Sequence, residues 1–152
     1  MSHRFYCEIN LHLTWHTKDN RPALSPEIEK TALHAIRRKA ESYRGVIVHA
    51  VNGTEDHVHA AVSIPPTVLI SEFVGQLKGY SSHEINQAFA GKAEHFDWQP
   101  GYGVVCFGTQ HLPWVIRYIE NQKQHHARKT IHERLERCMT EEDAESENEE
   151  AH

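Results

Sequence analysis

The chain has 152 residues, which suits a single domain, because single hydrophobic cores usually run to about 100–200 residues. An apolar fraction of 39% and a charged fraction of 24% are ordinary for a soluble protein. No apolar run approaches the ~18–20 residues needed to cross a bilayer, and the N-terminus lacks the charged-then-apolar pattern of a secretory signal. We therefore expect a cytoplasmic protein with no membrane partner. The three cysteines form no CxxC pair, which argues against a disulfide framework or a thiolate zinc site.

The net charge of −5 conceals an uneven distribution along the chain. Seven acidic residues and no basic residue lie between Glu141 and Glu150. Subtracting these seven from the 21 acids leaves 14 against 16 Lys and Arg, so the rest of the chain is slightly basic and suits a nucleic-acid partner. We expect a folded domain over residues 1–138 and an acidic, disordered tail over residues 139–152, because the tail has almost nothing apolar to bury.

The first expected elements are a strand and a helix. Residues 5–15 alternate apolar and polar side chains, which is the period of a strand with one face on a core. After a loop, Ser25 and Pro26 form an N-cap followed by proline at the first helical position. Apolar residues then continue at helical spacing, and we expect the helix to end before Gly45.

The middle of the chain predicts a hairpin. Residues 46–51 and 57–64 are strand-like, and residues 52–56 between them have the composition of a turn. Pro65 and Pro66 follow and end the second strand, because proline cannot donate to a sheet ladder.

The last elements complete a recognisable order. Residues 69–89 predict a helix, residues 101–107 a fourth strand, and Pro113 begins a long helix that we extend as far as Cys138. The first six elements follow the split βαβ, ferredoxin-like order. We therefore predict an α+β fold with a four-stranded antiparallel sheet and two helices on one face. The final helix is an addition, which must pack on the free sheet face or on a partner subunit.

The motif His57-Val58-His59 lies on a predicted strand. Alternate side chains of a strand share a face and stand about 6–7 Å apart at the backbone, so both imidazoles can converge on one ion while Val58 points into the core. Two histidines leave open positions on an ion such as Mg²⁺ or Mn²⁺, where a phosphate oxygen can bind. In a chain with 14 histidines the motif also fits ordinary surface histidines. We interpret Asp56 as a turn residue.

Tyr118 and Gln122 are four residues apart and share one face of the final helix. Neighbouring apolar residues already supply a packing face, so Tyr118 lies off its centre. A phenol beside cations and a metal is easier to deprotonate, as a tyrosine nucleophile requires. The basic residues of this helix, which we also predict to contact DNA, are Arg117, Lys123, Arg128 and Lys129.

These two motifs predict one reaction. Gln122 offers a neutral oxygen that, with His57 and His59, completes the coordination of a hard divalent ion, and it lies one helical turn from the phenol. Tyr118 is then expected to attack phosphorus in line, become bound to the 5′ phosphate and release a 3′ hydroxyl. Because the phosphotyrosine keeps the bond energy, rejoining needs no ATP. We therefore predict a metal-dependent single-strand DNA nuclease and strand transferase.

Four short segments carry a resemblance to a known family, and none is specific by itself. They are Asp56-His57-Val58-His59, Gln76-Leu77-Lys78-Gly79, Trp98-Gln99-Pro100-Gly101-Tyr102, and Tyr118-Ile119-Glu120-Asn121-Gln122 with His125-His126 after it. In this order, on a chain of this length, they resemble the small single-tyrosine HUH transposases of bacterial insertion sequences. The similarity covers roughly residues 5 to 130 of the chain.

The resemblance implies a ferredoxin-like core, dependence on Mg²⁺ or Mn²⁺, and cleavage and rejoining of single-stranded DNA at hairpin-flanked element ends. It assigns His57 and His59 as metal ligands, Gln122 as the third ligand and Tyr118 as the nucleophile. It implies a homodimer, in which the tyrosine helix of one subunit often completes the site of the other. It also makes Lys78 a candidate DNA contact, beside its reading as a solvated helix lysine.

Three alternatives stay open. The first is another HUH enzyme, a replication initiator or relaxase, although relaxases usually place the tyrosine before the histidines and initiators commonly carry further domains. The second is a noncatalytic, domesticated single-stranded nucleic-acid binding protein, which would need neither Tyr118 nor Gln122. The third is a small-substrate metal hydrolase, although β-barrel enzymes with such histidine pairs need more than the four strands predicted here.

Overall fold

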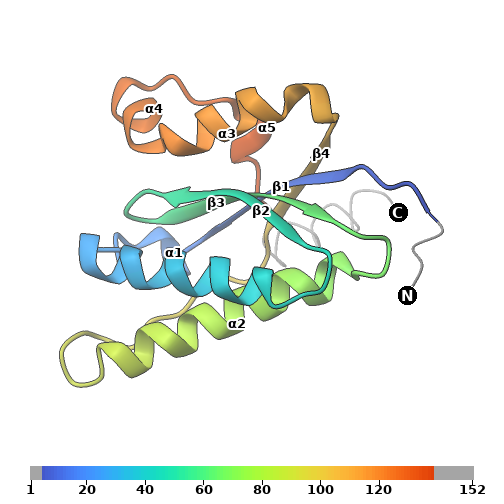
Figure 1. Ribbon diagram of the computed structural model, residues 1–152. Helices are drawn as coiled ribbons and strands as arrows, with labels where there is room; N and C mark the ends of the chain where they lie inside the picture. The colour runs from blue at the N-terminus through green and yellow to red at the C-terminus, as the bar shows by residue number, and fades with distance from the viewer. Residues whose placement is uncertain (1–4, 139–152) are drawn as a thin grey trace, which may run out of the picture.

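The computed structural model describes residues 5–138, so the predicted acidic tail at 139–152 lies outside the described residues. A four-stranded sheet lies between two helical layers (Figure 1). Its strands are β1 (Ile9–His16), β2 (Ile47–Gly53), β3 (His57–Ile64) and β4 (Gly103–Phe107). The helices are α1 (Pro26–Glu41), α2 (Ile70–Ala88), α3 (Leu112–Glu120), α4 (Gln122–Arg128) and α5 (Glu133–Glu136), with short 3-10 turns η1 (Lys18–Asn20) and η2 (Thr109–His111).

The strand order is β2-β3-β1-β4, and every neighbouring pair is antiparallel. In the register of the central pair, Thr14 lies opposite His59 and His16 lies opposite His57. With α1 between β1 and β2 and α2 between β3 and β4, this is the arrangement of a split βαβ fold. The predicted α+β, ferredoxin-like class is confirmed.

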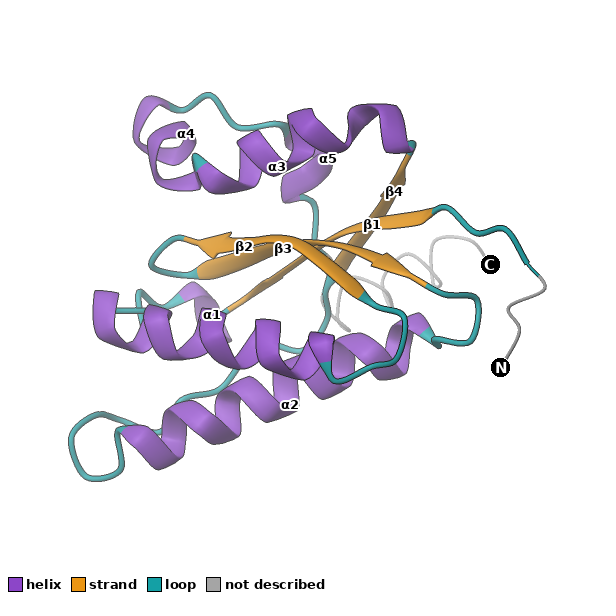
Figure 2. Cartoon of the chain, in the orientation of Figure 1, coloured by secondary structure: helices purple, strands orange, loops and turns teal. Residues whose placement is uncertain are grey.

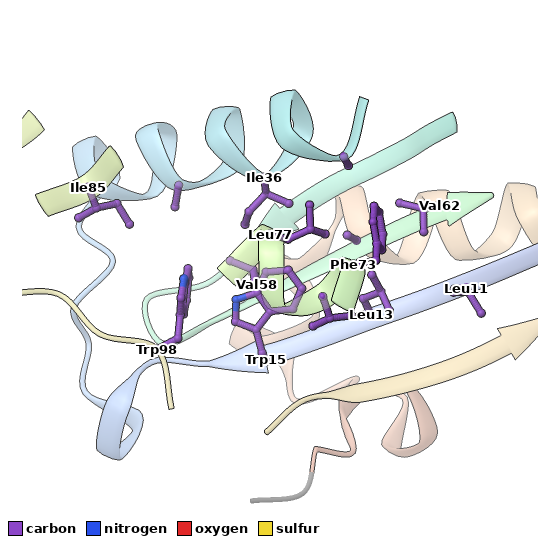
Figure 3. Close-up of a cluster of buried hydrophobic side chains, with 14 of the residues drawn as sticks. Leu11, Leu13, Trp15, Ile36, Val58, Val62, Phe73, Leu77, Ile85 and Trp98 are labelled. Carbon is purple, nitrogen blue, oxygen red and sulfur yellow. The ribbon is translucent and has the colours of Figure 1, made fainter. Parts of the chain in front are cut away.

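The main core lies between the sheet and the helix pair α1 and α2, which cover the same sheet face (Figure 2). Ser25 caps α1 by accepting a hydrogen bond from the backbone N–H of Ile28, and Pro26 begins the helix, as predicted. Leu13 of β1, Val58 of β3 and Leu77 of α2 meet in this core and are fully buried (Figure 3). The alternation of β1 and β3 thus places their apolar set on this side and their other side chains on the opposite face.

The opposite face of the sheet is covered by α3, α4 and α5 (Figure 2). A smaller apolar cluster holds α3 against β2 and β3: Val115 and Ile119 of α3 pack with Ala50 and Ala61 of the two strands. The added C-terminal helix therefore uses the free face of its own sheet. None of the helices in residues 5–138 is both long and apolar enough to cross a bilayer.

The prediction of one continuous helix from Pro113 to Cys138 is wrong. The first helix, α3, ends at Glu120, and the backbone of Asn121 after it (φ −102°, ψ 21°) leaves the helical region; α4 ends at Arg128, and Lys129 after it lies in the left-handed region. These breaks turn the chain back on itself, so that α5 contacts β1 and β4. The predicted first strand is also shorter than expected, because pairing begins at Ile9 and the Phe5 side chain is half exposed.

Candidate active site

The two predicted imidazoles lie side by side on β3. His57 and His59 project from the face opposite the main core, with 4.9 Å between ring centroids, while Val58 between them is buried in that core as expected. Both rings are almost completely buried, at 3% and 0% exposure. Strand alternation is the reason that two residues separated by one position share this face.

Each ring is held from its Nδ1 side. The Nδ1 atom of His57 lies 2.6 Å from the Asp56 carboxylate and 2.8 Å from the Thr54 hydroxyl. The Nδ1 atom of His59 lies 2.9 Å from Nε2 of His12, a buried residue of β1. A ring fixed through one nitrogen presents the other in a defined direction, as metal-ligating histidines commonly do. Asp56 is therefore both the predicted turn residue and an orienting group.

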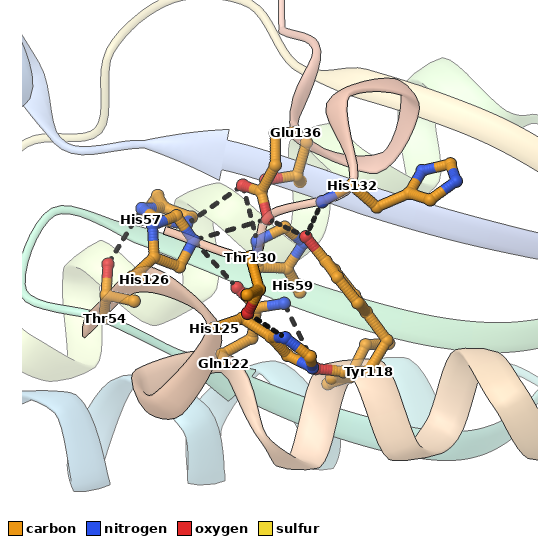
Figure 4. A network of polar contacts seen from close by, with 12 residues as sticks. Thr54, His57, His59, Tyr118, Gln122, His125, His126, Thr130, His132 and Glu136 are labelled. Atoms are coloured by element: carbon orange, nitrogen blue, oxygen red, sulfur yellow. Dashed lines mark hydrogen bonds and ion pairs between the residues drawn. The ribbon is translucent and has the colours of Figure 1, made fainter. Parts of the chain in front are cut away.

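Tyr118 projects from α3 toward the same cluster rather than into an apolar interior (Figure 4). Its ring centroid lies 6.2 Å from that of His59, and its ring stacks between Trp114 and His125. The hydroxyl donates to Oε1 of Glu136 at 2.6 Å and accepts from the backbone N–H of His132 at 2.8 Å. The structure thus brings the predicted tyrosine and the predicted histidine pair together within one chain.

Contacts with β2 hold the end of α3 in place. The side-chain amide of Asn52 donates to the carbonyls of Ile119 and Glu120, at 3.0 and 3.1 Å. Lys123 donates to Glu29 at 2.6 Å and to the carbonyl of Gly53 at 3.3 Å. The Asn52 bonds satisfy carbonyls at the C-terminal end of α3, and the Lys123 bonds attach the start of α4 to α1 and to β2.

Gln122 begins α4 and is completely buried. Its amide nitrogen donates to the carbonyl of Tyr118 at 3.2 Å, and its Oε1 lies 3.1 Å from Nε2 of His126. That Nε2 atom lies in turn 3.1 Å from Nε2 of His57. The predicted amide is therefore connected to the histidine pair through His126, one helical turn further along α4.

Two members of the site were missed by the sequence analysis. Glu136 of α5 places one carboxylate oxygen 3.3 Å from Nε2 of His57 and 3.1 Å from Nε2 of His59, and the other 3.3 Å from Nε2 of His126. A signal for His126 existed, since it is four residues after Gln122 on the same helical face. Glu136 carried no such signal, because no spacing relates it to either motif.

Electrostatics in the cluster follow from burial and from the carboxylates. Burial alone would lower the pKa of His57, but Asp56 and Glu136 outweigh it and raise the pKa to about 9. For His59 burial dominates and lowers the pKa to about 4. Burial and the hydrogen bond to Glu136 raise the pKa of Tyr118 to about 12. In this arrangement, in which a carboxylate lies against the hydroxyl, the phenol is harder to deprotonate. The expectation of easier deprotonation concerned a phenol beside a bound metal and stays a prediction.

The donor atoms of the cluster fit a divalent ion. Nitrogen or oxygen atoms of His57, His59, His126 and Glu136 all lie within 4.8 Å of one another. Nε2 of His59 is buried and has no hydrogen-bond partner of acceptable geometry among the described residues, although Glu136 lies close. A lone pair in that situation suits a metal, since imidazole and carboxylate are common ligands of Mn²⁺ and similar ions.

The five predicted DNA-contacting residues fall into two groups. Arg117, Arg128 and Lys129 are exposed on α3 and at the end of α4. Lys78 and Lys123 have contacts within the protein: Lys78 donates to the carbonyls of two residues that precede β4, at 2.8 and 2.9 Å, and Lys123 pairs with an acid of α1. These two lysines therefore hold parts of the fold together whether or not they also contact DNA.

A histidine pair and a tyrosine thus meet on the sheet face that α3, α4 and α5 cover, opposite the main core of a ferredoxin-like fold. The model of the IS200-like transposase family matches residues 5–122, and the chain belongs to that family. It is 28% identical over 119 residues to the ISDra2 transposase TnpA of Deinococcus radiodurans, covering 76% of this chain and 84% of the relative. It is 32% identical over 123 residues to the transposase of insertion sequence IS200 of Salmonella typhimurium, with 78% of each chain covered.

Solved structures share the fold. A crystal structure of a Deinococcus radiodurans protein assigned as a transposase superposes with a TM-score of 0.62 at 25% identity, covering 80% of this chain and 96% of that one. The structure of a REP-associated tyrosine transposase bound to a REP hairpin superposes with a TM-score of 0.58 at 18% identity, covering 83% and 73%. At that identity the second likeness shows the fold alone.

Proposed function

We propose that this member of the transposase family is a metal-dependent single-strand DNA endonuclease and strand transferase with Tyr118 as its nucleophile. The observation that carries the proposal is the position of the Tyr118 hydroxyl. It shares one carboxylate partner, Glu136, with the Nε2 atoms of His57 and His59. A group bound between the imidazoles and the phenol would contact both, as a phosphate under attack by a metal-assisted nucleophile must.

The proposed metal ligands are His57, His59 and Gln122, with Mg²⁺ or Mn²⁺ as the ion. The buried Nε2 atom of His59, which lies against Glu136 but makes no hydrogen bond of acceptable geometry within the described residues, supports this assignment, and so does the buried Gln122 oxygen beside His126. When bound, the ion would withdraw charge from a phosphate oxygen of DNA. The protein's own contribution is orientation, since Asp56 and His12 hold the two rings through their Nδ1 atoms.

The proposed cleavage step is a displacement at phosphorus. The Tyr118 oxygen forms a bond to phosphorus as the bond from phosphorus to the 3′ oxygen breaks; the phenol loses its proton and the departing oxygen gains one. The products are a 5′-phosphotyrosine and a free 3′ hydroxyl, and the reverse attack by another 3′ hydroxyl rejoins the strand. The backbone N–H of His132, which donates to the phenol oxygen, would stabilise negative charge on that atom.

The proposed substrate is single-stranded DNA next to a hairpin, because a structural neighbour is bound to a REP hairpin. We also propose a homodimer in the cytoplasm, as the family resemblance implies. We propose that Tyr118 acts together with the histidines of its own chain, and the packing of α3 on β2 and β3 supports this. We propose that the exposed cations Arg117, Arg128 and Lys129 contact the DNA backbone.

The test uses a single-stranded, hairpin-bearing oligonucleotide from the flanks of the coding sequence, labelled at its 3′ end and incubated with Mn²⁺. Wild-type protein should form a covalent complex that survives a denaturing gel. Tyr118→Phe should bind the oligonucleotide but form no complex, while Tyr80→Phe on α2 should behave as wild type. If wild type and Tyr118→Phe both bind and neither forms the complex, the chain is a noncatalytic DNA-binding protein.

A further inference from the structure

We propose that the DNA-free protein holds its metal in a closed site made by His57, His59, His126 and Glu136, before Gln122 serves as a ligand, and that a DNA phosphate replaces the Glu136 carboxylate. The inference deepens the proposed function and rests on it for the identity of the incoming group. His126 and Glu136 both lie beyond residue 122, where the match to the transposase family model ends. They are therefore features of this chain's C-terminal segment.

Three imidazole nitrogens converge on one carboxylate in this site. Glu136 lies within 3.3 Å of the Nε2 atoms of His57, His59 and His126, and its side chain is 12% exposed. The Nε2 atoms of His57 and His126 are also only 3.1 Å apart. Two imidazole nitrogens at this distance must share a proton or a cation, because two lone pairs facing each other repel. A divalent ion among these four groups satisfies every one of them.

The helix α5 is anchored to the rest of the fold on both sides of Glu136. Leu135, next to Glu136, is 4% exposed and lines the same pocket as Val105 of β4 and Val115 of α3. The carbonyl of Arg137 approaches Gly103 so closely that a Cβ atom there would collide with it. The Glu136 carboxylate is thus held between two anchored neighbours.

The Glu136 carboxylate lies between the Tyr118 hydroxyl and the two imidazoles of β3. One oxygen of Glu136 accepts the hydrogen bond of the Tyr118 hydroxyl, and the other faces His57 and His59. A phosphate attacked by Tyr118 while bound near these imidazoles needs the same position. A carboxylate and a phosphodiester are both oxygen anions, so one can replace the other against the same cation. Glu136 and DNA therefore exclude each other.

The experiment measures Mn²⁺ affinity of the DNA-free protein by isothermal titration calorimetry. Glu136→Gln should raise the Mn²⁺ dissociation constant about tenfold or more, and His126→Ala should do the same. Glu133→Gln changes an exposed acid of the same helix and is the matched control, with no more than about a twofold effect expected. Leu135→Ala keeps the carboxylate but loosens its anchor, so it should weaken Mn²⁺ binding as well. Far-UV circular dichroism in EDTA confirms that each variant is folded.

A second arm repeats the titration with saturating hairpin oligonucleotide in the Tyr118→Phe background, where no cleavage occurs. With DNA bound, Glu136→Gln should no longer change the Mn²⁺ affinity, because phosphate has taken the place of the carboxylate. If Glu136→Gln matches Glu133→Gln without DNA, Glu136 is not a ligand and the inference is overturned. If the effect of Glu136→Gln persists unchanged with DNA, displacement is overturned. Neither result depends on covalent-complex formation, so the proposed nuclease function can fail separately.

Discussion

The two faces of the sheet are built from the same strands and have opposite chemistry. Toward α1 and α2, β1 and β3 present Leu13 and Val58, which need only apolar neighbours. Toward α3–α5 the same strands present His12 and His59, equally buried but polar. Burying polar groups is costly unless each finds a partner, and on this face the partners come from distant segments of the chain. One face therefore stabilises the fold, and the other is kept polar for the site.

The largest effect should come from removing an imidazole of the polar face. His57→Ala should lower the rate of covalent-complex formation at least about 100-fold, because metal assistance contributes several kcal/mol to such reactions. The free energy of unfolding should change little, because His57 lies outside the main core. Gel quantification and urea denaturation in EDTA give the two values. A His57→Ala protein that is unfolded, or one that is fully active, would contradict the assignment of stability to one face of the sheet and of activity to the other.

On the apolar face of the sheet we expect a loss of stability without a loss of activity. Leu13→Ala should lower the free energy of unfolding by about 2–5 kcal/mol, because it leaves a cavity under α1 and α2. At a temperature where the variant is folded, its rate of covalent-complex formation should equal that of wild type. Urea denaturation measures the first value. A stable Leu13→Ala protein with lost activity would show that the two faces are coupled.

A smaller effect should follow from disturbing the contact between Gly103 of β4 and Arg137, the residue after α5. Gly103→Ala places a methyl group against the carbonyl of Arg137, so the segment carrying Glu136 must shift. Mn²⁺ affinity of the DNA-free protein should fall several-fold, as calorimetry can measure. Gly108→Ala is the control, because the nearest atom to its new methyl group is Cγ of Gln110, at an ordinary contact distance of 3.8 Å. Equal Mn²⁺ affinities of the two variants would show that the contact between Gly103 and Arg137 does not position the Glu136 carboxylate.

The most local effect is expected where Asn52 attaches the tyrosine helix α3 to β2. Asn52→Ala removes two hydrogen bonds to carbonyls at the end of α3, which should cost about 1–2 kcal/mol of unfolding free energy. Hydrogen exchange of α3 amides should accelerate more than that of α1 amides. Uniform acceleration in both helices would mean that α3 is not held locally by this contact.

Much of the apolar face could be predicted from the sequence, because its signals are local. The strand-like residues 57–64, between a turn and Pro65, predicted β3 with the bounds that the structure shows, and Ser25 with Pro26 predicted the start of α1. That His57 and His59 share a face followed from the alternation of side chains along a strand. Their burial did not, since it depends on helices that come more than fifty residues later.

The C-terminal segment was harder to predict, because tertiary contacts decide its path. We predicted one helix through residues 113–138. The burial of Gln122 and the hydrogen bond from the backbone N–H of His132 to the Tyr118 hydroxyl oxygen instead favour a helix that is interrupted, so that the chain turns back toward the sheet. Nothing in the sequence near Glu136 distinguishes it from the acidic residues around it. Its role in the site is visible only when α5 is placed against β1 and β4.

The most direct test of the account is to locate the bond between protein and DNA. After nuclease digestion of the covalent complex, trypsin should release residues 118–123, which follow Arg117 and end at Lys123 and contain a single tyrosine. Mass spectrometry should find the nucleotide remnant on this peptide, attached to Tyr118 through phosphate. A remnant on any of the other four tyrosines, or on none of the five, would contradict the assignment of Tyr118 as the nucleophile.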